Sequence, residues 1–395
     1  MPQSYKHTPS RDWWLLLGLA LGVTVTNGFA RFAYGLILPS MRAELGWTYA
    51  QAGWLNTANA MGYIAGAILT MALIGRIPPA RLFAFGLVTT TLSLLATGLV
   101  PALGWQTFWR IAAGLFGAMS FSTAGALTAG LFADAPRKNA LAIAILFGSG
   151  GGLGIVLAGA SIPPMLGFQG DTAWPWAWVM VGSASLLMTP PGLWAAWHLR
   201  NLGGRAAAKA PLPLRRMLPE YAGYASFGLG YIVYLTFLSA WMREQAASPH
   251  HIALTWVLLG GCITVSPFLW RGIFARFAGG APLAMILTGI ATGSALPVLW
   301  PGPTGLIASA LVFGLCVFMA PGAVTNFARQ NLDTAQWGRA ISLFTVVFAF
   351  AQTAGPYAAG WIGDLAGSIG LSLLVAAGLL LSGAMIAFLQ KPLRS

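Results

Sequence analysis

The chain has 395 residues, of which 57% are hydrophobic and only 7% are charged. Because soluble domains carry about 25% charged residues, this composition and a mean hydropathy of +0.74 exclude an ordinary soluble protein and predict an integral membrane protein. The net charge of +13 would suit a nucleic-acid-binding protein, but most basic residues fall in the loops on one side of the predicted membrane spans, as the topology of a membrane protein requires.

Apolar stretches long enough to cross a bilayer recur along the whole chain, and the short alternating segments of a membrane β-barrel do not. We therefore predict an all-α membrane protein. The twelve expected spans are 13–39, 48–75, 79–101, 103–133, 137–166, 173–198, 219–246, 250–272, 278–300, 302–332, 336–365 and 367–390.

The first span contains Arg31, within TNGFARFAYGLILPSMRAELGW (26–47). A charge at the centre of a membrane helix costs about 2.5–3.5 kcal/mol or more. On an α-helix, Thr24, Asn27, Arg31 and Tyr34 would share one face. One interpretation of Arg31 is an anion-binding group, whose planar fork matches carboxylate or phosphate. The other is a structural arginine, bonded to backbone carbonyls or stacked on an aromatic ring.

The second and fourth spans contain further polar residues. Asn59 of span two could bind a solute, although hydrogen bonding between helices is the simpler interpretation. Gly62 and Gly66 beside it form a small-residue ridge that predicts helix packing. In span four, Arg110 fits a solute site and a structural role equally well.

The stretch 199–220 is the longest outside the spans, and it is basic and contains Pro and Gly. It predicts an N-terminal bundle (1–198), a linker (199–218) and a C-terminal bundle (219–395).

The two halves resemble each other at an offset near 200 residues. Tyr34 matches Tyr234, and Arg76 matches Arg276. Such matches in the same order predict duplication of a six-helix unit, and secondary transporters are often built from such repeats. The partners of Arg31 and Arg110 are Tyr231 and Ala310, so neither arginine recurs in the C-terminal half.

The seventh and eleventh spans contain three further candidates. Tyr231 and Tyr234 could provide an aromatic wall with hydroxyl donors, and ordinary aromatic packing is the alternative. Gln352 lies next to the helix-breaking pair Gly355 and Pro356, which is typical of a cavity position.

The acidic residues and histidines all fall at span ends or in loops, so the sequence shows no ionisable relay at membrane depth. Glu220 and Glu244, at the two ends of span seven, come nearest. Coupling to a proton therefore stays open. We expect no cofactor, no metal and no enzyme activity, because the chain has no phosphate-binding loop, no metal-ligand spacing and no catalytic constellation.

The basic residues predict the topology of the chain. The loops and ends on one side hold seventeen of them: Lys6, Arg11, Arg76, Arg81, Arg137, Lys138, Arg200, Arg205, Lys209, Arg215, Arg216, Arg271, Arg276, Arg329, Arg339, Lys391 and Arg394. The opposite loops hold only Arg42 and Arg243. By the positive-inside rule, both termini lie in the cytoplasm.

Three stretches carry a resemblance to a known family: GFARFAYGLILPSMRAELGWTYAQAGWLNTANAMGYIAGA (28–67), WRIAAGLFGA (109–118) and FTVVFAFAQTAGPYAAGWIGDLAGS (344–368). The chain resembles the major facilitator superfamily over almost its whole length, and within it the YbfB/YjiJ-type bacterial branch. The resemblance implies two pseudo-symmetric six-helix bundles, with spans one, four, seven and ten around a central cavity.

The chain departs from the superfamily pattern at three places. LIGRIPPAR (73–81) keeps Arg76 but lacks the usual acid, and Ala275 stands beside Arg276 where an Asp is usual. The glycine-rich GSGGGLG (148–154) lacks the proline of the antiporter motif, so drug–proton antiport is not supported by it.

We therefore expect a secondary transporter of the bacterial inner membrane that moves a small organic solute by alternating access. An organic anion is favoured, and efflux of drug-like hydrophobic compounds is the alternative. The expected partners are the solute and the lipid bilayer, without nucleic acid, and we expect a monomer. The candidate substrate-binding or gating residues are Arg31, Asn27, Tyr34, Arg110, Asn59, Tyr231, Tyr234 and Gln352, with Arg76 and Arg276 as the cytoplasmic loop motif.

Overall fold

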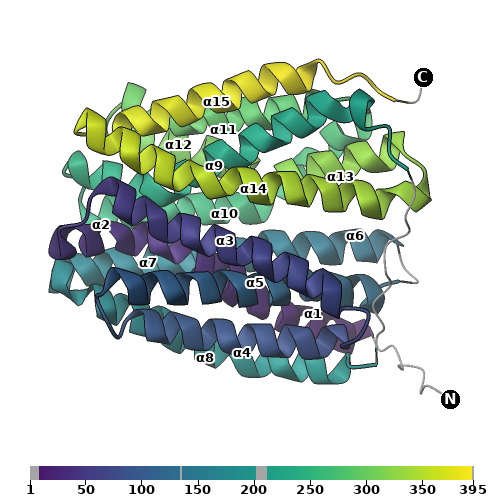
Figure 1. The fold of residues 1–395 in the computed structure, drawn as a ribbon, viewed down its shortest axis with the longest axis horizontal. Helices are drawn as coiled ribbons and strands as arrows, with labels where there is room; N and C mark the ends of the chain where they lie inside the picture. Colours follow the sequence, from purple (N-terminus) through teal and green to yellow (C-terminus); the bar gives the residue numbers. More distant parts are fainter. Residues whose placement is uncertain (1–8, 134–135, 202–210, 394–395) are drawn as a thin grey trace.

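The computed structural model describes residues 9–133, 136–201 and 211–393, and every regular element among them is a helix. The long helices run side by side along one direction (Figure 1). In such a bundle the backbone polar groups are satisfied within each helix, as a bilayer requires. The prediction of an all-α protein is confirmed for these residues.

The N-terminal half begins with one long helical segment that changes type along its length. Its elements are α1 (Pro9–Val23), the π-helix η1 (Thr24–Ala33), α2 (Tyr34–Leu45), α3 (Tyr49–Leu73), α4 (Pro79–Thr97), α5 (Leu103–Leu131), α6 (Pro136–Ala144), the π-helix η2 (Ile145–Ser149), α7 (Gly150–Gln169), the 3-10 helix η3 (Asp171–Ala173) and α8 (Trp174–His198).

The C-terminal half repeats this plan. Its elements are the 3-10 helix η4 (Leu214–Met217), α9 (Leu218–Glu244), α10 (Pro249–Arg276), α11 (Ala281–Leu299), α12 (Pro303–Val317), α13 (Ala320–Asn331), α14 (Thr334–Ala366) and α15 (Gly370–Phe388).

Within the described residues, eleven helical segments are long and apolar enough to cross a membrane. The twelfth span is α3, which has 25 residues and carries Asn56 and Asn59 on a buried face. Because these polar side chains are shielded from lipid by neighbouring helices, they do not prevent α3 from crossing the bilayer. The count of twelve agrees with the prediction.

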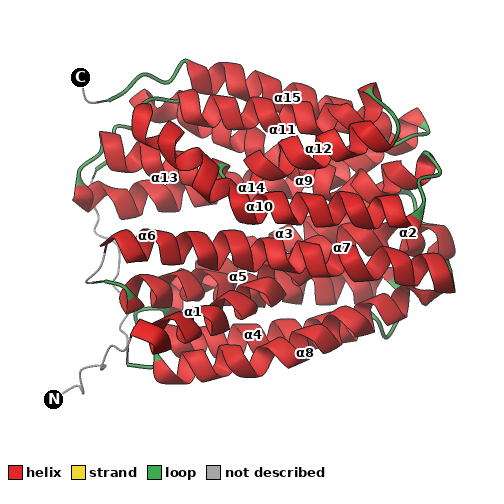
Figure 2. Ribbon diagram, turned by 180° about the vertical axis from the view of Figure 1, so that it is seen from behind, coloured by secondary structure: helices red, strands yellow, loops and turns green. Residues whose placement is uncertain are grey.

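The two halves form two layers, with α1–α8 on one side and α9–α15 on the other, as Figure 2 shows from behind. They meet where α3 packs on α14 and α7 packs on α10. We call the end of the bundle that carries both chain ends the terminal end, and the opposite end the distal end (Figure 1).

Local sequence signals explain where the helices of the interface begin and end. Thr48 and Gln51 form a capping box at the start of α3. Gly46 ends α2 and Gly367 ends α14, both with a positive φ that glycine adopts without strain. Gly62 and Gly66 let α3 approach the backbone of α5 closely, which confirms the predicted packing role of this ridge.

Candidate functional site

Arg31 lies in η1 at the junction of the two halves, and its side chain is 7% exposed. Its Nη2 atom donates hydrogen bonds to the Tyr231 hydroxyl on α9 and to Oε1 of Gln352 on α14. The Tyr231 hydroxyl donates to the same Gln352 oxygen at 3.1 Å. Three of the candidates from the sequence therefore meet in one cluster, which joins the N-terminal half to the C-terminal half.

Aromatic rings surround the guanidinium of Arg31. The ring centroids of Phe32, Tyr63, Tyr231 and Phe348 lie 5.1–5.9 Å from its Cζ atom. Ring faces at this distance attract a cation. Among the described residues no carboxylate contacts Arg31. Within this part of the chain, its charge is therefore stabilised by neutral groups alone.

Arg31 lies on the pseudo-two-fold axis of the repeat. Arg31 and Tyr231 are equivalent positions in the two halves, and equivalent residues contact each other only near the axis that relates them. One turn further along, Gly35 packs against Leu235 at the same offset, so closely that a Cβ would collide with the Leu235 carbonyl oxygen. The cluster thus occupies the interface of the repeats, where transporters of this architecture hold their solutes.

Gln352 carries a hydrogen-bond donor that the protein leaves unused. Its side chain is 0% exposed, and its Nε2 atom has no hydrogen-bond partner, while its Oε1 atom accepts from Arg31 and Tyr231. A buried donor without a partner costs about 1–3 kcal/mol. A ligand with an acceptor oxygen beside Arg31 would remove this cost.

Arg110 is fully buried, and its two Nη atoms donate to the protein, while its Nε atom has no hydrogen-bond partner. Nη1 donates to the Ala30 carbonyl at 2.6 Å and Nη2 to Oδ1 of Asn56 at 3.3 Å. The guanidinium lies 4.9 Å from the Tyr34 ring centroid and 5.8 Å from that of Trp178. Arg110 therefore holds the backbone of η1 just before Arg31 and does not join the Arg31 cluster.

The polar residues of η1 and the first residue of α2, Tyr34, do not share one face, in contrast to the expectation. Thr24 donates to the Gly150 carbonyl at 2.9 Å, and Asn27 also lies against α7. The Tyr34 hydroxyl donates to a backbone carbonyl of α3 at 2.7 Å. The physical reason is that η1 is a π-helix, whose i→i+5 hydrogen bonds widen the turn. Side chains spaced three or four residues apart in this segment therefore contact different neighbouring helices.

Two further candidates lie away from the cluster. Asn59 donates to the backbone carbonyl of Arg110 at 3.0 Å. The Tyr234 hydroxyl lies 2.6 Å from that of Ser309, and its ring stacks on Phe313 at 3.9 Å. Each of these contacts connects helices of one half, so the structure uses both residues for packing.

Polar contacts between the halves continue at the distal end. Arg243 pairs with both oxygens of Asp171 at 2.6 and 3.0 Å, and also donates to Ser40 at 3.0 Å. The hydroxyl of Tyr49 donates to Glu244. These contacts fasten the distal ends of α2, α3 and η3 to the end of α9.

The first turn of α3 is capped by a carboxylate from the opposite half. Asp364 on α14 accepts the backbone N–H of Tyr49 at 2.7 Å and that of Ala50 at 2.9 Å. Negative charge is favourable at a helix N-terminus. Beside this cap, Gly53 packs closely against the Pro356 carbonyl. The 28–67 and 344–368 stretches, which carry the family resemblance, therefore form this interface.

The hydrogen bonds between α1–α8 and α9–α15 that join described residues all lie at Arg31 or on its distal side. At the terminal end, α6 and α13 pack chiefly against helices of their own halves. Figures 1 and 2 both show the ribbons of the two halves diverging in that direction. Among the described residues, the hydrogen bonds between the two halves thus extend from Arg31 toward the distal end.

The loop arginines and the acids of span seven lie far from the cluster along their helices. Arg76 follows α3 and Arg276 ends α10, and both are exposed at equivalent places of the terminal end. Glu220 is buried in the first turn of α9, and Glu244 ends the same helix. Neither carboxyl contacts Arg31.

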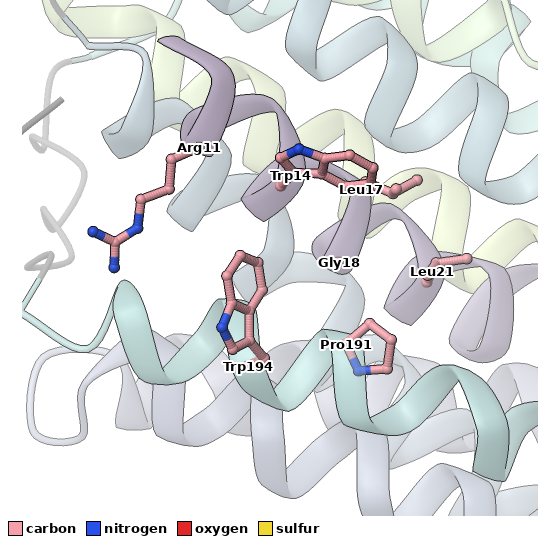
Figure 3. Close-up of a pocket in the computed structure, with 7 residues that line it drawn as sticks. All are labelled: Arg11, Trp14, Leu17, Gly18, Leu21, Pro191 and Trp194. Atoms are coloured by element: carbon pink, nitrogen blue, oxygen red, sulfur yellow. The ribbon is translucent and has the colours of Figure 1, made fainter. Parts of the chain in front are cut away.

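A groove of about 650 Å³ opens between α1 and α8 near the terminal end (Figure 3). The ring of Trp14 is 63% exposed and that of Trp194 42% exposed on its walls, with Arg11 at one end. Exposed tryptophan at the end of a span is typical of a lipid interface. The groove therefore faces lipid and is separate from the Arg31 cluster.

Sequence reasoning missed three rings of the cluster, those of Phe32, Tyr63 and Phe348. A signal in the sequence existed for Phe348. It lies four residues before Gln352 on α14, a spacing that brings two side chains to the same face of an α-helix. This spacing was the signal that could have selected it. Phe32 could not be selected, because its direction depends on the π-helix.

The family described as "Uncharacterised MFS-type transporter YbfB" matches residues 23–388 of the chain. The chain belongs to this family. As a YbfB-type member of the major facilitator superfamily, it is a multi-pass membrane transporter and not an enzyme. No curated protein sequence matches it significantly.

Solved structures of other transporters share the fold of this YbfB-type protein. A bacterial homologue of the human lysosomal transporter Spinster, inward-facing and unoccupied, has a TM-score of 0.72 at 15% identity, covering 97% of this chain and 98% of its own. A mutant of the nucleoside transporter NupG has a TM-score of 0.73 at 12% identity, covering 95% and 99%. A mutant of the peptide transporter POT has 0.68 at 15% identity, covering 94% and 95%. At these identities the likeness shows the fold alone.

Proposed function

We propose that this YbfB-type protein is a secondary active transporter that moves a small organic anion across the bacterial inner membrane by alternating access. The observation that carries the proposal is Arg31, a cation on the pseudo-two-fold axis whose partners are all neutral. A carboxylate or phosphate would supply the missing negative charge and match the planar guanidinium fork.

Binding of an anion at Arg31 would be linked to movement of the halves. An oxygen of the solute would compete with Tyr231 and Gln352 for the guanidinium, and these two bonds connect the halves. When the solute binds, Arg31 therefore loses a hydrogen bond to the opposite half and gains one to the solute. Such differential binding is what allows a ligand to shift a conformational equilibrium.

The side from which a solute reaches Arg31 follows from the position of the hydrogen bonds between the two halves. The halves are hydrogen-bonded at Arg31 and beyond it toward the distal end. With both termini in the cytoplasm, as the positive-inside rule predicts, this arrangement is inward-facing. The solute then reaches Arg31 from the terminal end.

The test is thermal unfolding of the detergent-purified protein with a panel of organic anions, cations and neutral metabolites. A ligand that binds only the folded state raises the melting temperature by mass action. Wild type is compared with Arg31→Gln, and Arg200→Gln serves as the control that removes an exposed arginine outside the candidate site. We expect shifts from carboxylates or phosphates that survive in the control and vanish in Arg31→Gln.

A second candidate function is efflux of drug-like hydrophobic compounds, which the aromatic rings around Arg31 favour. Shifts from lipophilic cations or neutral compounds alone, unchanged in Arg31→Gln, would support it and contradict the anion proposal. Drug susceptibility of cells that overproduce the protein provides an independent measurement.

A further inference from the structure

The rings next to Arg31 belong to a larger aromatic surface contributed by both halves. Tyr63 contacts Phe121, with ring centroids 6.4 Å apart, and Phe121 contacts Phe147 at 4.4 Å. In the other half, Phe348 stacks with Tyr231 at 5.6 Å. A further ring, Phe318 on the C-terminal side, packs at 5.7 Å on Phe32. We call Tyr63, Phe121, Phe147, Tyr231, Phe318 and Phe348 the aromatic wall.

The aromatic wall extends from Arg31 toward the terminal end. On α14, Phe348 comes one turn before Gln352, and on α5, Phe121 comes three turns after Arg110. Of the six rings, only Tyr231 is buried, at 3% exposed. The other five are partly exposed. Beyond Arg31, the contact of Gly35 with Leu235 closes the interface.

The cluster provides for one negative charge and not for two. Arg31 is the cation of this cluster, and both Nη atoms of Arg110 are already bonded to Ala30 and Asn56, while the Arg110 Nε atom has no partner. Nε2 of Gln352, which shares the cluster with Arg31, is a donor without a partner and suits the second oxygen of the same carboxylate. A second carboxylate on the solute would be buried without a cation, which is costly.

From these observations we infer that the solute is an aromatic monocarboxylate, an inference that rests on the anion transport proposed above. Its carboxylate binds Arg31 and Nε2 of Gln352, and its ring packs against the aromatic wall on the terminal side. The wall offers offset-stacked and edge-to-face partners, each worth about a twofold to tenfold gain in affinity beyond burial alone.

The experiment measures dissociation constants of the full-length detergent-purified protein by isothermal titration calorimetry. The probes are benzoate, phenylacetate, cinnamate and indole-3-acetate. The acid that binds most tightly is then compared with its ring-saturated analogue, its neutral amide and a dicarboxylate with the same ring. We expect the ring-saturated acid to bind about twofold to tenfold more weakly, and the amide and the dicarboxylate more weakly still.

Two variants of α14 test whether the aromatic ring of Phe348 itself contributes to binding of the solute. Phe348→Leu removes a ring of the wall and keeps an apolar side chain. Phe350→Leu is the matched control, because Phe350 is 62% exposed on the same helix. We expect Phe348→Leu to weaken the aromatic acid about twofold to tenfold and to leave the ring-saturated acid unchanged. The control changes neither.

The outcomes distinguish the two proposals. If aliphatic acids or dicarboxylates bind through Arg31 as tightly as aromatic monocarboxylates, the anion function stands and the aromatic inference is wrong. Equal binding of the aromatic acid by wild type and Phe348→Leu, in the presence of a normal Arg31 dependence, also overturns the inference. If no anion binds, or if binding does not depend on Arg31, the proposed function itself fails.

Discussion

The two halves of this YbfB-type protein use the same helices and place different chemistry at equivalent positions. Arg110 of the N-terminal half lies under the Tyr34 ring and bonds the backbone of η1. At the equivalent place of the C-terminal half, next to Ala310, Tyr234 bonds Ser309 and stacks on a phenylalanine. A buried arginine is thus not required to pack this part of the fold.

The comparison is sharper at the axis, where Arg31 faces its own repeat partner, Tyr231. Duplication of one six-helix unit would first give the same residue at both positions. Two arginines in contact on the axis would repel each other, and two tyrosines would bring no charge to the centre. One cation against one neutral hydroxyl gives a site with a single charge, as binding of one monoanion requires.

The largest expected effect comes from placing a tyrosine at both of the equivalent positions on the axis. Arg31→Tyr removes the charge-assisted hydrogen bonds of the anion, and we expect affinity to fall about tenfold to a hundredfold. Uptake of the best-binding acid into proteoliposomes should fall with it. Arg200→Gln, which removes an exposed arginine outside the candidate site, should retain both. Full uptake by Arg31→Tyr would show that Arg31 is a packing residue.

A double variant that exchanges the two residues at the axis tests whether the arginine must come from the N-terminal half. Combining Arg31→Tyr with Tyr231→Arg keeps one cation and one hydroxyl at the centre. Since the two side chains are in contact, we expect the double variant to regain about tenfold in affinity over Arg31→Tyr, measured by calorimetry. No recovery would mean that the orientation set by η1, and not charge alone, determines binding.

Arg110→Ala gives the N-terminal half the residue of its repeat partner, Ala310. The Ala30 carbonyl loses its buried donor, so we expect the free energy of unfolding to fall by about 1–3 kcal/mol. The melting temperature should drop, while the affinity of the remaining folded protein changes less than in Arg31→Tyr. Unchanged stability with abolished binding would instead place Arg110 in the solute site.

The sequence predicted the spans and three members of the cluster from patterns within single helices, and it predicted the repeat from a comparison of the two halves. Gln352 was selected from the helix-breaking pair that follows it, and Tyr231 from the aromatic side of span seven that it shares with Tyr234. The direction of Arg110 was not predictable, since its acceptor, the Ala30 carbonyl, lies on another helix. The π-helix was not predictable either, because residues 24–33 satisfy an α-helical pattern equally well.

The next prediction concerns two equivalent contacts between the halves, α3 with α14 and α10 with α7. The N-terminus of α3 has its own Thr48 cap and also donates backbone hydrogen bonds to Asp364 of the other half, whereas α10 is capped by its own Ser248. Asp364→Asn keeps an acceptor and removes the charge at the helix end, so we expect the closed distal end to lose about 0.5–1 kcal/mol. Pulsed electron paramagnetic resonance between labels at Glu44→Cys and Gln245→Cys, without the two native cysteines, should show a larger open population. An unchanged distance distribution would show that close glycine packing between the halves, and not the Asp364 cap, keeps the distal end closed.

The smallest effect is expected from the ion pair of Arg243 and Asp171. Their side chains are 39% and 32% exposed, and exposed pairs are worth about 0.2–1 kcal/mol because water and salt screen them. Asp171→Asn should therefore enlarge the open population in the same label pair by less than about fivefold at low salt. Raising the ionic strength should reduce the difference from wild type, because wild type loses the attraction that the variant already lacks. An effect of Asp171→Asn that exceeds that of Asp364→Asn, or that persists in high salt, would make this pair the main closure of the distal end and reverse the order proposed for the two contacts.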